Sequence, residues 1–198
     1  MSSYPLGGNG GIMSDIVSSN REGIRRLKTE DGATCYDCGR MQRFFYEFNI
    51  PSDQSRWIRV TVPNGSVKGI IIRDQRLNVD AGSVRFRAYR DLTIEANFAA
   101  IQSPTSGLFA ANNIVGAPVY DLQTEIEISN DTGTFSGGIV AEVLRVRSAG
   151  ATAQQVTVSG SAAGRRGVAP AVYHLQLENI GNSSALGVYD LEFEEVPV

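Results

Sequence analysis

Apolar and polar residues alternate along most of the chain, as they do in β-strands that bury one face. The alternation is cleanest at residues 57–62, 83–88, 122–128, 173–178 and 189–194, and less regular strand candidates lie at 24–28, 44–49, 67–73, 139–147 and 155–158. No stretch sustains the i, i+3, i+4 spacing of an amphipathic helix. The pattern therefore predicts an all-β fold of about ten strands, arranged as a β-sandwich or jelly roll.

Turn-forming residues separate these segments. Residues 63–65 and 129–133 are rich in Pro, Asn, Asp and Gly, and we interpret 129–133 as a hairpin turn, not as a calcium loop. Residues 181–184 separate the last two predicted strands, which are expected to form a terminal hairpin. Two longer segments, 97–116 and 160–167, are predicted to be loops that bind a ligand or reach a neighbouring subunit.

The chain divides into an arm and one domain. The glycine-rich run at 7–11 cannot pack by itself, so residues 1–20 are predicted to form a flexible N-terminal arm. Residues 21–198 are predicted to form a single β-sandwich domain. A change of composition near residue 116 suggests a sub-boundary there, but no linker-like run separates the two parts.

Charge is distributed unevenly along the 198 residues, whose net charge is −3. Residues 1–90 hold 14 Lys and Arg against 9 Asp and Glu, whereas residues 91–198 hold 4 against 12. The basic half can pair with the acidic half inside the fold, which is the favoured interpretation, or can dock one subunit on the next. The acidic balance argues against a protein that coats nucleic acid.

Few residues of the chain support metal or nucleophilic chemistry. Cys35 and Cys38 form a C-x-x-C pair without a second pair of ligands, so both are interpreted as ordinary thiols. His174 is the only histidine and alternates away from the predicted core, which suggests a solvated or interface side chain. A cupin-like metal centre takes two or three histidines. We therefore predict a protein that is not an enzyme and holds no metal or cofactor.

Acidic residues near the C-terminus share one strand face. Asp190, Glu192 and Glu194 lie at i, i+2 and i+4, which predicts a negative stripe that faces water or a basic partner. Nothing in the sequence indicates the two unlike carboxyl groups around a cleft that glycosidase chemistry requires.

Arginine supplies the best candidates for a binding surface. The interface candidates are Arg73, Arg76, Arg85, Arg87 and Arg90, together with Trp57 on the strand at 57–62 and Tyr4 and Leu6 in the arm. The aromatic residues Phe86 and Tyr89 lie near the arginines and suggest RNA stacking. The acidic second half favours an acidic protein surface as the partner instead.

A carbohydrate- or receptor-binding module is the alternative function. Sugar recognition commonly uses an exposed aromatic ring with polar neighbours. Trp57 is the only tryptophan and is expected on the face opposite Ile58, so it is the candidate for such stacking or for a subunit interface.

Residues 167–182 (GVAPAVYHLQLENIGN) and 186–195 (LGVYDLEFEE) resemble the closing strands of tailed-bacteriophage virion proteins, and residues 19–31 (SNREGIRRLKTED) resemble that group as well. The resemblance implies a non-enzymatic β-sandwich on a virion, as a capsid decoration (cement) protein or a tail-surface protein. Its partners would then be capsid or tail proteins, and it would form a homo-oligomer such as a trimer.

No segment of the sequence suggests export or a membrane span. The N-terminus lacks a basic start followed by an apolar run, and the most apolar stretch, 69–72, is far shorter than a membrane span. We therefore expect synthesis in the host cytoplasm, incorporation into the virion and no contact with membranes.

The N-terminal arm is predicted to act in docking to the particle and not in folding. Deleting residues 2–11 leaves the β-sandwich folded but weakens attachment to particles, because the glycine-rich arm orders only on docking. Circular dichroism checks the fold, and co-sedimentation with purified particles checks attachment. Equal decoration by the truncated and full-length proteins would contradict a docking role for the arm.

Overall fold

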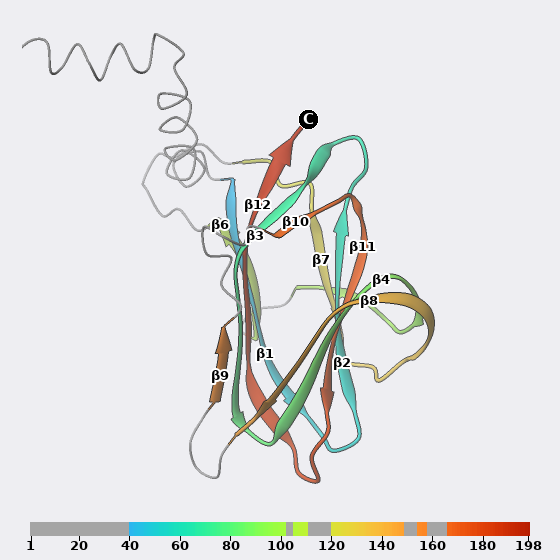
Figure 1. The fold of residues 1–198 in the computed structure, drawn as a ribbon, viewed down its shortest axis with the longest axis vertical. Coiled ribbons are helices and arrows are strands. Elements are labelled where there is room, and N and C mark those ends of the chain that lie inside the picture. The colour runs from blue at the N-terminus through green and yellow to red at the C-terminus, as the bar shows by residue number, and fades with distance from the viewer. Residues whose placement is uncertain (1–39, 102–104, 111–119, 149–153, 158–165) are drawn as a thin grey trace, which may run out of the picture.

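A computed structural model describes residues 40–101, 105–110, 120–148, 154–157 and 166–198 (Figure 1). The described residues form twelve strands and no helix. The strands are β1 (Met41–Ile50), β2 (Ser55–Val62), β3 (Val67–Ala81), β4 (Ser83–Glu95), β5 (Ala99–Ala100), β6 (Ser106–Ala110), β7 (Glu125–Ser129), β8 (Thr134–Arg147), β9 (Gln154–Thr157), β10 (Arg166–Val168), β11 (Ala171–Asn179) and β12 (Ala185–Pro197). The predicted arm, Tyr4, Leu6, the strand candidate at 24–28 and the C-x-x-C pair lie outside the described residues.

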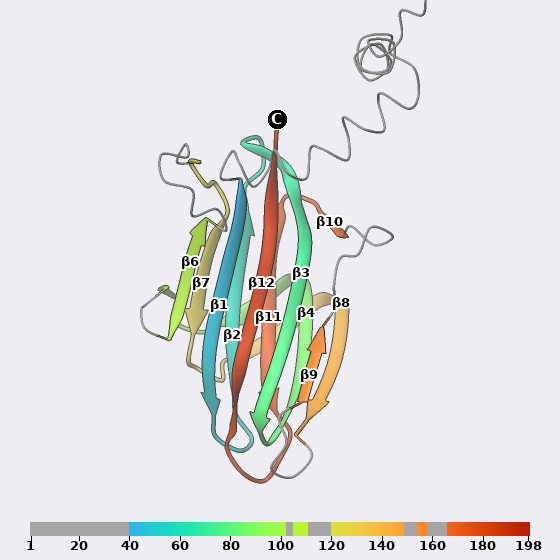
Figure 2. The same cartoon turned by 90° about the vertical axis from the view of Figure 1, so that its left-hand side faces the viewer.

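The strands form two antiparallel sheets that face each other (Figures 1 and 2). In sheet A the order is β10-β3-β12-β1-β6, and β9 also pairs with β3. In sheet B the order is β5-β7-β2-β11-β4-β8. The all-β class predicted from the alternation is confirmed.

The connectivity is that of a jelly roll. β1 pairs with β12, β2 with β11, β3 with β9 and β10, and β4 with β8. Each pair joins an early strand to a late one, and the pairs lie alternately in sheets A and B. This nesting is what two Greek keys produce when they wrap into a double sheet. β6 extends sheet A beside β1, while β7 and β5 extend sheet B beside β2.

Two predicted hairpins are wrong. The last two strands do not pair with each other, because β11 lies in sheet B and β12 in sheet A, so residues 180–184 cross between the layers. Residues 130–133 likewise join β7 to β8, which lie far apart in sheet B. Local alternation identifies the buried face of a strand but not its partner, and this explains both errors.

The segment predicted as a long loop at 97–116 contains two short strands, β5 and β6. Both are edge strands with small residues, so their sequences carry little alternation. Of the second predicted loop, 160–167, only the last two residues are described, and they begin β10. Strands from before and after residue 116 share each sheet.

The core lies between the two sheets and is formed by the alternating inward side chains. Phe86 of β4 stacks on Tyr189 of β12, with ring centroids 5.4 Å apart and planes 18° apart. Phe44 of β1 packs against the same tyrosine at 6.4 Å. These three side chains are 5% exposed or less, and burying each contributes roughly 1.5–3 kcal/mol. The core therefore joins strands from both ends of the chain.

Gly187 of β12 lies where a side chain cannot fit. A Cβ atom there would lie 2.1 Å from the backbone carbonyl oxygen of Asn78 and 2.6 Å from the Phe48 ring. The β12–β3 register shifts between Leu186 and Gly187, which brings the two backbones close together. Backbone atoms cannot rotate away as a flexible side chain can.

Replacing Gly187 with alanine is predicted to destabilise the protein by about 1–3 kcal/mol, because β12 and β3 must separate to admit the methyl group. Gly167→Ala in β10 is the matched control, since a Cβ atom there would meet nothing within 4 Å. Urea unfolding of both variants measures the difference. Equal stability of the two variants would contradict the close approach at Gly187.

Candidate functional site

The outer face of sheet B, which points away from the core, carries four of the residues singled out in the sequence: Trp57, Arg85, Arg87 and His174. Strand pairing places the outward side chains of this face in four cross-strand rows. The first row is Ser55, Glu178 and Arg85; the second is Ser129, Trp57, Gln176 and Arg87; the third is Glu127, Arg59, His174 and Tyr89; the fourth is Glu125, Thr61 and Val172. Each row crosses the sheet at right angles to its strands.

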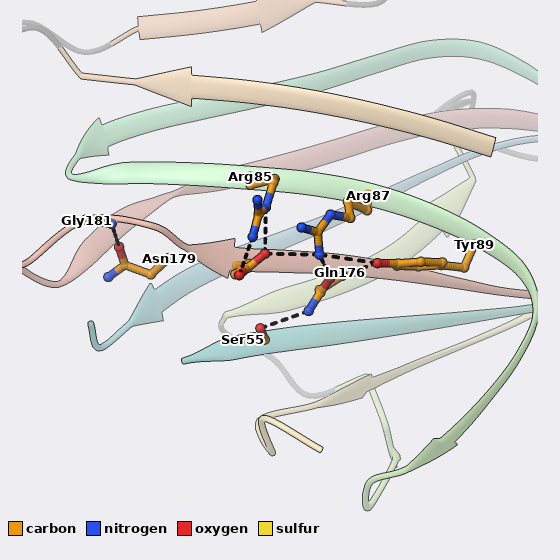
Figure 3. A network of polar contacts seen from close by, with 8 residues as sticks. Ser55, Arg85, Arg87, Tyr89, Gln176, Asn179 and Gly181 are labelled. Carbon is orange, nitrogen blue, oxygen red and sulfur yellow. Dashed lines mark hydrogen bonds and ion pairs between the residues drawn. The ribbon is translucent and has the colours of Figure 1, made fainter. Parts of the chain in front are cut away.

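Five polar side chains of the first two rows form a continuous network: Ser55, Glu178, Arg85, Gln176 and Arg87 (Figure 3). Arg85 donates to both carboxylate oxygens of Glu178, at 2.7 and 2.6 Å, and these hydrogen bonds raise the pKa of Arg85. Arg87 lies 3.2 Å from Glu178 and donates to the Gln176 side-chain oxygen at 3.1 Å. Gln176 in turn donates to Ser55 Oγ at 3.1 Å. The network cross-links β2, β11 and β4.

The five predicted interface arginines do not form one surface. Arg85 and Arg87 lie on β4 in sheet B, whereas Arg73 and Arg76 lie on β3 in sheet A. Arg90 also lies on β4, directly before Asp91. All five have a carboxylate of this chain within 4 Å: Glu194 for Arg73, Asp74 for Arg76, Glu178 for Arg85 and Arg87, and Asp91 for Arg90. These five arginines therefore do not form a single docking face.

Instead, the basic first half of the chain pairs with the acidic second half, which confirms the favoured interpretation of the charge distribution. Five ion pairs join an arginine before residue 90 to a carboxylate after it: Arg43–Asp190, Arg59–Glu127, Arg73–Glu194, Arg85–Glu178 and Arg87–Glu178. Two of the three residues in the predicted negative stripe, Asp190 and Glu194, are thus paired within the fold.

Trp57 lies opposite the core-facing Ile58, as the alternation predicts, but its side chain is 0% exposed. Its indole Nε1 donates to the Thr132 carbonyl oxygen at 2.8 Å, and the Phe135 ring packs edge-on at 5.2 Å. Tyr89 and Leu92 complete a second, smaller apolar cluster outside the main core. A buried ring cannot stack on a sugar, so this candidate role for Trp57 is excluded in the single chain.

The ends of β4 and β8 build this cover. β4 changes direction after Asp91, whose φ is 57°, and the following residues Leu92, Ile94 and Phe98 pack over the outer face. β4 and β8, which pair with each other, are strongly curved in Figure 1. Asp131 accepts hydrogen bonds from the backbone and side-chain nitrogens of Asn97, both at 2.9 Å, and holds the two segments together.

His174 also lies on the outer face, as predicted, but it is 5% exposed and not a solvated side chain. The Phe98 ring packs against it at 5.8 Å. Burial, together with the nearby positive charge of Arg59, lowers the pKa of His174 to about 4. Its Nδ1 atom is buried and has no hydrogen-bond partner among the described residues. The imidazole is therefore neutral at physiological pH.

A groove of about 530 Å³ opens above the third and fourth rows. Its floor and walls are formed by Arg59, Thr61, Leu92, Thr93, Ile94, Glu125, Glu127, Val172 and His174. Arg59 donates to Glu127 through Nε at 2.6 Å, and its guanidinium lies 4.4 Å from the centre of the Phe98 ring. Of these nine residues the sequence analysis singled out only His174. The alternation at 122–128 also places Glu125 and Glu127 on the outward face of one strand, but no local pattern shows that residues 92–94 cover this face.

Within the described ranges, no group of three or more His, Cys, Asp or Glu side chains is placed to hold a metal ion. The same residues contain no helix long and apolar enough to cross a membrane. The fold and this face define an all-β protein of jelly-roll topology with a polar groove on one outer face. Compared with known proteins, the sequence matches no protein-family model and no curated protein. The resemblance to phage virion proteins stays a prediction.

The buried histidine predicts a pH-dependent stability. The unfolded chain binds a proton at His174 near pH 6.5, but the folded chain binds it only near pH 4. Folding therefore favours the neutral form of His174. The contribution of this preference to the free energy of unfolding is complete above about pH 6.5. It decreases by up to about 3 kcal/mol as the pH falls towards 4.

Denaturant unfolding between pH 4 and pH 8 measures this loss. His174→Gln keeps a polar side chain but removes the titration, so the difference in unfolding free energy between the wild type and this variant should change over that interval. Titration of surface carboxylates is common to both proteins and cancels. A difference that stays constant with pH would show that His174 does not titrate abnormally.

Proposed function

We propose that the chain is a non-enzymatic structural component of a tailed-bacteriophage virion, which acts by contact with neighbouring subunits. Jelly rolls serve as viral capsid domains, lectins and cupins, so the fold supports the proposal by analogy only. A cupin-like metal centre would need several histidines, and the chain has one. The proposal therefore rests on a feature suited to subunit contact.

That feature is the free edge of sheet B. β8 is 14 residues long and pairs with β4 on one side, while no described strand pairs with its other side (Figure 2). Its side chains Ile139, Val140 and Val143 are 66%, 51% and 50% exposed. A long edge strand with exposed apolar residues is a template for pairing with another chain. Between Ile139 and Val143 the strand carries neither lysine nor proline, two residues that commonly block such pairing, and Glu142 is the one charged side chain of this stretch.

A second copy of the chain fits this edge. Val143 lies opposite Arg87 and Val140 opposite Tyr89, and the register shift between these pairs leaves both valines on the outer face although they are three residues apart. A two-fold axis between the valines would place Val140 of one copy against Val143 of the other, twice. Such a contact is isologous and closes as a dimer. We therefore propose a dimer in place of the trimer considered from the sequence.

The double variant Val140→Lys with Val143→Lys is predicted to abolish the dimer, because two like charges would face each other across the edge. Light scattering on the full chain measures the oligomer, with the wild type expected at twice the chain mass and the variant at the chain mass. Leu186→Lys in β12 is the matched control, since Leu186 is also exposed but lies in sheet A.

Virion membership is tested on particles purified in a density gradient from cells infected by the virus that encodes the chain. Quantitative mass spectrometry should find the wild type and Leu186→Lys in the particle band at a fixed copy number, and the double variant depleted from it. Absence of the wild-type chain from the particles would refute the proposed function. A monomeric wild type, or a dimer that survives both lysines, would refute the edge contact.

A further inference from the structure

The groove on the outer face of sheet B is large enough to hold a small molecule. Thr61 and Val172 line it within the fourth row, and Arg59 and His174 within the third. Residues 92–94 at the curved end of β4 form one wall. Its volume of about 530 Å³ falls within the ~300–1,000 Å³ of typical ligand pockets. Three paired strands fix the floor, so the polar groups keep their positions without a ligand.

Several polar groups in the groove have no partner in the described part of the protein. The carboxylate of Glu125 and the hydroxyls of Thr61 and Thr93 make no side-chain hydrogen bond or ion pair there. The Nδ1 atom of His174 is buried and also lacks a partner. A buried polar atom without a partner is rare in native proteins, because losing water without gaining a hydrogen bond is unfavourable. His174 lines the groove, so the protein leaves polar groups without partners at this place.

The charges in the groove disfavour an anionic ligand. Arg59 and Glu127 neutralise each other, and the Phe98 ring beside the guanidinium holds Arg59 in place. His174 is neutral, so Glu125 leaves the groove with one net negative charge. A sulfated or carboxylated ligand would be repelled by Glu125 and would find no unpaired cation, because Glu127 already neutralises Arg59. The unpaired carboxylate of Glu125 can accept hydrogen bonds from ligand hydroxyls, and a cationic ligand is the competing outcome that the test below includes.

The remaining chemistry is that of sugar recognition. Carboxylate, guanidinium and hydroxyl groups lie side by side and can accept from and donate to neighbouring hydroxyls of one ring. Leu92, Ile94 and Val172 provide apolar surface for the C–H face of the ring. We propose that this groove binds a neutral, hydroxyl-rich saccharide. The proposal goes beyond the structural role in the virion and does not depend on the edge of β8.

The test uses the full-length chain on an array of immobilised glycans with three arms: neutral oligosaccharides, sialylated or sulfated oligosaccharides, and a lysine- and arginine-rich peptide. The wild type should be retained on the neutral arm alone. Titration calorimetry with the free neutral oligosaccharide then gives its Kd. Glu125→Gln and Thr61→Val should each weaken binding about tenfold, because each removes one hydrogen-bonding group from the groove.

Glu192→Gln is the matched control, because it makes the same carboxylate-to-amide change on β12 in sheet A and should leave the Kd unchanged. Thermal melting of Glu125→Gln, Thr61→Val and Glu192→Gln checks that each variant remains folded. In the wild type, the imidazole nitrogen resonances of His174 should shift on addition of the oligosaccharide. No retention on the neutral arm, retention on either charged arm alone, or an unchanged Kd in both groove variants would each overturn the proposal.

Discussion

Antiparallel pairing between early and late strands is the constraint on which the rest of the molecule depends. Because β1 lies beside β12 and β2 beside β11, residues more than a hundred positions apart become direct neighbours. This nesting brings the arginines of the first half against the carboxylates of the second, as in Arg85 with Glu178. It also joins both ends of the chain in one core, where Phe44 meets Tyr189. The charges that are unevenly distributed along the sequence are thus largely paired with each other inside the fold.

The two sheets have unlike outer faces. Sheet A presents ion pairs such as Arg43 with Asp190. Sheet B carries a second apolar cluster around Trp57, built when β4 turns at Asp91 and its end packs back over the sheet. That cover has two consequences. It removes the tryptophan from solvent, and it adds a wall above the paired strands, which turns a flat polar face into a groove.

Jelly rolls place contacts and ligands on different parts of one rigid scaffold. In this chain the free edge of β8 and the groove above His174 lie on the same sheet. The groove lies over β7, β2 and β11 and takes one wall from residues 92–94 of β4, which pair with residues 135–137 of β8. The proposed contact at Val140 and Val143 lies further along β8, so it would leave the groove open. A virion protein with both would attach to its particle and bind a saccharide at the same time.

The sequence by itself determined the fold class and the facing of most strands, because a period of two is a local property: Ile58 inward, Trp57 and His174 outward. It also determined that charge could be balanced within one chain. Only the tertiary structure decided which strands pair, that residues 180–184 cross between sheets instead of closing a hairpin, and that Trp57 and His174 are covered. These outcomes depend on contacts such as Phe135 on Trp57 and Phe98 on His174, between residues distant in sequence, and no local pattern encodes them.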